Sequence, residues 1–166
     1  MLKQGDTIIY GNSGICRIVD IKEEDFLGEK KNYYVLKPLY ESRTTIHVPE
    51  FNERLVSKIK PVFSKNELLS LLGRLHEIEP IWIDNDKQRQ EKYKELLDSG
   101  ERDSVVGIIK ALLSRNLELT KCGKKLNYTD EQFLSTAKHI FEGECAYVLE
   151  IDKNEVENYI FTNEKA

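Results

Sequence analysis

The sequence predicts an α+β fold, in which a small, strongly bent five-stranded β-barrel (residues 1–62) precedes an all-α domain of about five helices (residues 63–166). Two observations carry this prediction. Up to about residue 60, short β-branched runs alternate with turn residues, which is typical of short strands. From Ser64 onward, apolar residues recur every three or four positions, which is typical of helices that bury one face.

The first domain contains five runs that favour strands. They are "TIIY" (7–10), "ICRIVDI" (15–21), "YYVLKPL" (33–39), "TTIHVP" (44–49) and "RLVSKIKPV" (54–62). We expect Gly11, Asn12 and Gly14 to supply the positive φ angles of a hairpin turn between the first two runs. Pro38 and Pro49 each end a strand or place it at a sheet edge, because proline cannot donate to the ladder.

The second domain begins with a capping box, Ser64 followed by Glu67. Helical periodicity then predicts helices over 64–75, 86–100, 103–118 and 129–148, and a last short one after "DKNE" (152–155) that includes Val156, Tyr159 and Ile160. Gly100 is expected to end the second helix, and "TDEQ" (129–132) is a second capping box. Gly107 weakens its helix by about 1 kcal/mol relative to alanine, so tertiary packing must hold that helix together.

Composition limits the classes of protein that fit. The net charge is −4, and phosphate contacts need clustered Lys and Arg, so strong general affinity for nucleic acid is not expected. The charge is uneven, since residues 87–138 carry eleven Lys and Arg against eight Asp and Glu, whereas residues 139–166 carry two against seven. The odd number of cysteines, three, disfavours a disulfide framework. With no long apolar run and no apolar N-terminal stretch, we expect a cytoplasmic protein without a membrane partner.

No catalytic pattern is found. "GNSG" lacks the lysine and hydroxyl of a phosphate-binding loop and precedes a strand, and it is not the G-x-S-x-G of a nucleophilic serine. The three histidines are isolated, and no cysteine spacing matches a zinc site. We therefore expect no enzyme, no metal, no cofactor and no small-molecule substrate.

Two features suggest binding. Trp82, the only tryptophan, is either a core anchor between the two domains or an exposed aromatic that stacks on nucleic acid. Basic residues follow it at Lys87, Arg89, Lys92 and Lys94, but Glu91 and Glu95 among them also fit a solvated helix with i,i+4 pairs. The strand "TTIHVP" could leave an open edge to which a partner adds its own strand.

The order and spacing of several segments resemble one family along nearly the whole chain. "GDTIIYGNSGICRIVDI", "LGEKKNYYVLK" and "TIHVP" resemble the N-terminal domain of the CarD family of bacterial transcription regulators, which also occurs as the RNA-polymerase-interacting domain of transcription-repair coupling factors. "EKYKELLDSGE", "VVGIIKALLSRN" and "AKHIFEGECAYV" resemble the family's C-terminal domain. The resemblance implies a Tudor-like barrel that binds the polymerase β subunit through a strand edge. It also implies a helical domain that lies against promoter DNA at the upstream fork of the open bubble.

Carried over to this chain, the resemblance implies a polymerase contact at Thr44, Thr45, Ile46, His47, Val48 and Pro49. His47 stands where well-known members have arginine, and a second family arginine falls near Glu24. The family's wedge tryptophan aligns with Asp86, four residues after Trp82, and of the two basic residues beside it only Arg89 carries over. The expected DNA contacts are Trp82, Arg89, Lys92, Lys124, Lys125 and Lys138.

The sequence thus predicts a non-enzymatic transcription regulator. It would bind the RNA polymerase β subunit through the β domain and modulate open-complex stability through weak promoter contacts of the helical domain. If it contacts the open fork better than closed duplex, it shifts the population toward the open complex. The alternative is a polymerase-docking adaptor without direct DNA contact, which the acidic C-terminal region and the displaced tryptophan favour.

Overall fold

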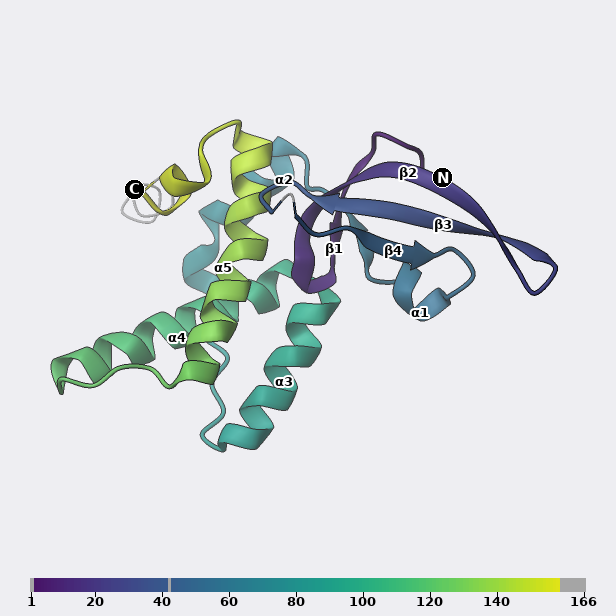
Figure 1. The fold of residues 1–166 in the computed structure, drawn as a ribbon. Helices are drawn as coiled ribbons and strands as arrows, with labels where there is room; N and C mark the ends of the chain where they lie inside the picture. Colours follow the sequence, from purple (N-terminus) through teal and green to yellow (C-terminus); the bar gives the residue numbers. More distant parts are fainter. Residues whose placement is uncertain (1, 42, 159–166) are drawn as a thin grey trace.

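A computed structural model describes residues 2–41 and 43–158 (Figure 1). The predicted order of elements is confirmed: a β region comes first and a helical region follows. Each region has its own apolar core, one beneath the sheet and one among the helices. Tyr159 and Ile160, expected in the last helix, lie outside the described residues.

Five strands form one antiparallel sheet in the order β4-β3-β2-β1-β5. They are β1 (Thr7–Tyr10), β2 (Gly14–Phe26), β3 (Glu29–Pro38), β4 (Ile46–Pro49) and β5 (Ile59–Pro61). The long β2 pairs with β1 over its first residues and with β3 along most of its length. The register of β2 with β3 shifts between Ile18 and Asp20, and such an irregularity bends a strand. The sheet is open, with β4 and β5 at its two edges.

The β core is built from one face of the sheet, because its members are cross-strand partners. Its buried members are Ile8, Cys16, Ile18, Tyr34, Leu36 and Val48. The short helix α1 (Glu53–Val56) lies between β4 and β5, and its Leu55 and Val56 pack against this core. Figure 1 shows the far halves of β2 and β3 extending away from the rest of the molecule as a hairpin.

The helical region contains α2 (Lys65–Gly73), α3 (Asp86–Ser99), α4 (Arg102–Lys121) and α5 (Tyr128–Leu149), with 3₁₀ turns η2 (Leu75–Glu77) and η3 (Lys153–Glu155). The capping box of Ser64 and Glu67 is present, and Gly100 ends α3 with a φ of 69°. The predicted start of the fourth helix was wrong. Asn127 caps α5 instead of Thr129, because its side chain accepts from the N–H of Asp130. Asp152 likewise makes no side-chain cap bond at η3.

The "GNSG" turn is a single 3₁₀ turn, η1 (Gly11–Ser13), between β1 and β2. Gly11 and Gly14 have φ angles of 44° and 74°, as expected, but Asn12 does not have a positive φ. That part of the prediction was wrong, because a 3₁₀ turn keeps its central residue right-handed and leaves the left-handed angles to the glycines.

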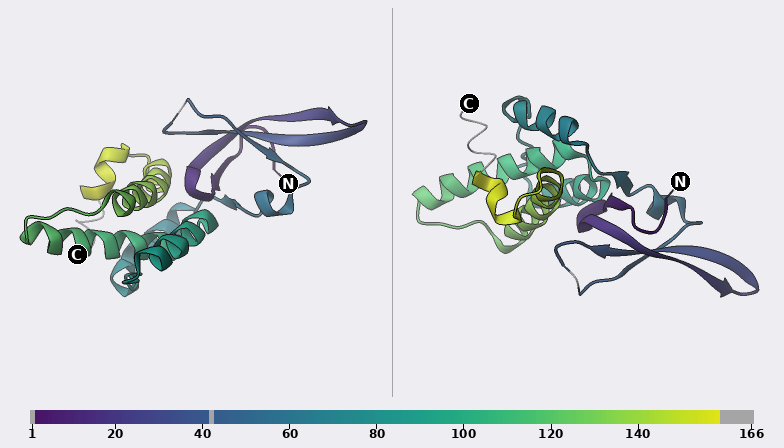
Figure 2. Two further views of the ribbon diagram at one scale, coloured as in Figure 1. Left: turned by 60° about the horizontal axis from the view of Figure 1, so that its bottom comes forward. Right: turned by 90° about the horizontal axis from the view of Figure 1, so that it is seen from above.

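The same turn joins the two regions, and Figure 2 shows it lying against the helices. The ring Nε2 of His139, on α5, lies 3.2 Å from the carbonyl oxygen of Ser13. Lys58, whose carbonyl oxygen accepts the N–H of Gly11, forms an ion pair of 2.9 Å with Asp98, on α3. A Cβ on Gly11 would lie 3.3 Å from the carbonyl oxygen of Asp98, so little more than glycine fits there.

Candidate functional site

The polymerase contact expected from the sequence falls on the edge strand β4. Thr44 and Thr45 precede the strand and are exposed, as is His47, whereas Ile46 and Pro49 are half-buried. The hydroxyl of Thr44 donates to the carboxylate of Glu41. Val48 is fully buried in the β core, so its side chain anchors the strand and is not available to a partner.

The pairing of β4 with β3 decides which backbone groups face outward. Val48 lies opposite Tyr34, and His47 lies opposite Val35. The N–H of Glu50 donates to the carbonyl oxygen of Asn32, so these two residues form a hydrogen-bonded pair. Every second pair of an antiparallel ladder is hydrogen-bonded, so Val48 and Tyr34 form the next such pair. The N–H and C=O of Val48 therefore point toward β3. The N–H and C=O of His47 therefore point away from β3. In the described part of the chain no strand pairs with this outer side.

Trp82 lies on the second candidate surface, in the segment between η2 and α3. The residue is 36% exposed, so it is neither a fully buried core anchor nor a free wedge. The indole Nε1–H donates to Asp84 at 2.8 Å. The guanidinium carbon of Arg89 lies 4.4 Å from the ring centroid and that of Arg115 lies 5.7 Å away, both within cation–π range.

Arg89 is not a free phosphate ligand, which corrects the sequence-based expectation. Only 2% of it is exposed. Its Nε and Nη2 donate to the two carboxylate oxygens of Asp130 at 3.1 and 2.8 Å. Nη2 also donates to Asp86, and Nη1 donates to the carbonyl oxygen of Ile83, each at 2.8 Å. The side chain is thus committed to contacts inside the protein.

The lysines expected to contact DNA lie in three places. Lys124 and Lys125 are exposed in the α4–α5 loop, and Lys125 shares with Trp82 the lining of a surface hollow of about 360 Å³. Lys92 is exposed on α3 beside Glu95. Lys138 lines a different hollow, beside α4, and forms an ion pair of 2.8 Å with Glu157. The structure therefore brings Trp82 and Lys125 together and leaves Lys138 apart.

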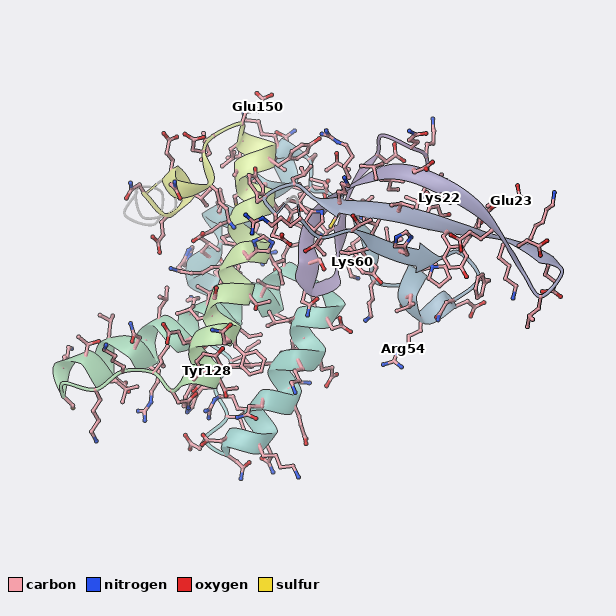
Figure 3. The ribbon with its side chains drawn as sticks, viewed as in Figure 1. Lys22, Glu23, Arg54, Lys60, Tyr128 and Glu150 are labelled. Atoms are coloured by element: carbon pink, nitrogen blue, oxygen red, sulfur yellow. The ribbon has the colours of Figure 1, made fainter. Side chains whose placement is uncertain are left out.

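Sequence reasoning missed two residues near this hollow. Arg115, on α4, lies over Trp82 and lines the hollow with Leu119 and Asn127. Tyr128, next to Asn127 at the start of α5 (Figure 3), is 76% exposed, which is unusual for so large an aromatic. Neither residue lies near Trp82 in the sequence. The packing of α4 against α5 brings Arg115 and the start of α5 to the hollow that Trp82 lines.

Other kinds of site find no support in the described residues. Burial raises the pKa of Cys16 to about 12 and also raises the pKa of Cys145, so neither thiol is a ready nucleophile. No group of His, Cys, Asp or Glu in the described ranges has the geometry of a metal site. No helix there is long and apolar enough to cross a membrane.

Comparison with known proteins identifies both regions of the chain. A family model described as CarD-like/TRCF RID domain matches residues 2–60, and one described as CarD, C-terminal domain matches residues 69–161. The chain belongs to the CarD family. Domains of this family are non-catalytic transcription-factor domains, and the N-terminal one is of the RNA-polymerase-interacting type. The chain is thus a transcription-related, polymerase-interacting CarD-family protein.

One relative matches over almost its full length. It is a protein of Bacillus subtilis (strain 168) named "Putative transcription factor YdeB". The two chains are 25% identical over 162 residues, which cover 96% of this chain and 99% of the relative. The match therefore includes both the sheet and the helices.

Proposed function

We propose that this CarD-family protein binds the β subunit of RNA polymerase by adding the outer edge of β4 to a strand of that subunit. The observation that carries the proposal is the unpaired edge at His47, in a domain of the polymerase-interacting type. Strand addition takes its affinity from backbone hydrogen bonds, so it tolerates the histidine that replaces the family's arginine. Thr44, Thr45, Ile46 and Pro49 border this edge.

A proline at position 47 tests the docking mode. Because the N–H of His47 faces away from β3, H47P removes one donor from the outer edge and leaves the pairing with β3 intact. We expect H47P to lose co-elution with purified RNA polymerase, whereas H47A, which keeps the N–H, retains it. Circular dichroism checks that both variants are folded. Unchanged co-elution of folded H47P would exclude strand addition at this edge.

We further propose that the helical domain contacts promoter DNA at the fork of the open complex and so changes the lifetime of that complex. Trp82, Lys124 and Lys125 are the contacts we favour, since an aromatic ring beside exposed lysines suits an unstacked base and its phosphates. Lys92 extends this surface along α3. The protein needs no catalytic group for such a role, because it acts by binding one state of the promoter more tightly than the other.

One observation favours the adaptor alternative. Asp84 and Asp86 are exposed and line the same hollow as Trp82, and carboxylates oppose phosphate. If the repulsion between these carboxylates and DNA phosphates outweighs the attraction of the lysines, the protein docks on the polymerase without touching DNA. Footprinting of polymerase on a promoter, with and without the protein and at several salt concentrations, separates the two. An upstream-fork footprint that the protein extends supports DNA contact, and an unchanged footprint supports the adaptor.

A further inference from the structure

The segment that carries Trp82 has no regular secondary structure, yet neighbouring helices hold its backbone at several points. The N–H of Ile81 donates to the carbonyl oxygen of Gly107, in α4, at 3.0 Å. The hydroxyl of Tyr93, in α3, donates to the carbonyl oxygen of Ile81 at 2.6 Å. Arg89 Nη1 donates to the carbonyl oxygen of Ile83. Trp82 therefore sits between two fixed residues and is not on a free loop.

Arg89 is itself fixed in place. Its contacts with Asp130, Asp86 and the two carbonyl oxygens of Ile83 and Asp84 occupy the Nε and both Nη groups of the planar guanidinium. Asp130, 3% exposed, is held in turn by the side-chain amide of Asn127, which donates to its Oδ2 at 3.1 Å. Contacts from α5, from the first turn of α3 and from the Trp82 segment itself therefore fix the plane of Arg89, and the bidentate one comes from Asp130.

Trp82 lies against this fixed cation. The ring is 4.4 Å from the Arg89 guanidinium carbon, and its N–H is held by Asp84. About a third of the residue is exposed, and it lines the same hollow as Lys125. The indole is therefore held on the protein side while part of it faces outward.

Stability alone does not account for the buried pair. Removing two charges from water costs several kcal/mol, and a buried ion pair is often no more stabilising than apolar residues of the same volume. The cap of α5 does not need the Asp130 carboxylate either, because the side chain of Asn127 already accepts the N–H of Asp130. A buried ion pair beneath a partly exposed tryptophan is better explained by the orientation that it gives to the ring.

We propose that Asp130 and Arg89 are positioning residues that hold Trp82 preorganised for stacking on an unpaired base. The proposal rests on the DNA contact proposed above. Because the ring is held before binding, it loses little freedom when a base stacks on it, and preorganisation of this kind is a known source of affinity. Asp130 acts only through Arg89 and touches no ligand.

Since Trp82 is the only tryptophan, its fluorescence reports on this arrangement alone. We expect D130N and R89K to increase acrylamide quenching of Trp82 and to shift its emission to the red. D130N keeps the shape of Asp130 but removes the charge that holds Arg89. R89K keeps the positive charge but loses the planar fork, so a change in both variants assigns the effect to orientation rather than to charge.

The chain offers a matched control in Glu144. This carboxylate, as buried as Asp130, accepts two hydrogen bonds from Arg102, whose guanidinium carbon lies 3.7 Å from the ring centroid of Phe63. E144Q removes a buried charge of the same kind in the same domain, away from Trp82. We expect it to leave quenching of Trp82 unchanged. Unchanged quenching in folded D130N and R89K, or an equal increase in E144Q, would overturn the positioning role.

A second readout separates this inference from the proposed function. Polymerase bound to fork-junction promoter DNA is titrated with the wild type, D130N and W82A. We expect D130N to weaken the stabilisation of the fork complex roughly two- to tenfold while co-elution with polymerase is retained. If W82A has no effect on the fork complex, the DNA contact at Trp82 is wrong. The quenching result still decides whether Asp130 and Arg89 orient the ring.

Discussion

At the scale of single residues, Gly107 lowers the stability of its own helix but allows a close contact with a segment distant in the sequence. It lies inside α4, where glycine lowers helix stability. A Cβ at this position would lie 2.9 Å from the carbonyl oxygen of Glu79 and from the side chain of Ile81. Only glycine lets the segment that carries Trp82 lie so close to α4. The sequence predicted that packing must compensate for Gly107, and the structure identifies the packing partner.

We predict that G107A lowers the free energy of unfolding by about 1–3 kcal/mol, because the clash with Glu79 and Ile81 outweighs the gain in helix propensity. Urea unfolding measures this. The control is G73A at the end of α2, where nothing lies within 4 Å of the added Cβ. It should be neutral or stabilising by up to about 1 kcal/mol. If the two substitutions changed the free energy of unfolding equally, the close approach of Glu79 and Ile81 would not explain the glycine at position 107.

At the scale of elements, local signals predicted the strands, the capping box at Ser64 and the end of α3 at Gly100, because each depends on neighbouring residues. They did not predict what lies against η1. His139 follows Ser13 by 126 positions. The spacing of apolar residues shows which face of a helix is buried, but it does not show which distant turn packs against that helix. The hollow at Trp82 was missed in the same way, since Arg115 and Asn127 reach it only through the packing of α4 on α5.

The contact of η1 with α5 predicts a pH dependence. Burial, together with the Lys153 ammonium beside Nδ1, lowers the pKa of His139 from its ordinary 6.5, against smaller opposing effects of the Ser13 carbonyl and Glu41. The unfolded chain therefore binds a proton near pH 6.5 that the folded chain binds only at lower pH. Above that range His139 is neutral in both states. The free energy of unfolding must then fall as the pH drops from about 6.5 to the folded pKa.

Substitution of His139 isolates this effect from the carboxylates. H139Q keeps an N–H donor for the carbonyl oxygen of Ser13 and removes the titration. We predict that the wild type loses stability relative to H139Q as the pH falls from about 7.5 to about 5.5, as measured by urea unfolding at each pH. Parallel pH profiles of the two proteins would show that His139 does not titrate differently on folding.

At the scale of the whole molecule, the two regions are joined by more than a linker. Arg102 donates to Glu144 through two nitrogens and to the carbonyl oxygen of Pro61, the last residue of β5. Glu144 also accepts the N–H of Phe63. The chain between the sheet and α2 is thus tied to both α4 and α5. The proposed role, docking through β4 with DNA contact at Trp82 and the α4–α5 loop, requires such a junction, because the two surfaces must keep a fixed relative position.

The most direct test of the central claim is the dissociation half-life of a promoter open complex, measured after addition of a competitor, with and without the protein. We expect the wild type to lengthen the half-life roughly three- to tenfold, which corresponds to about 1 kcal/mol of preference for the open state. H47P should abolish the effect through lost docking, and W82A should reduce it with docking retained. An unchanged half-life when the wild type is bound to polymerase would exclude stabilisation of the open complex and leave the adaptor function.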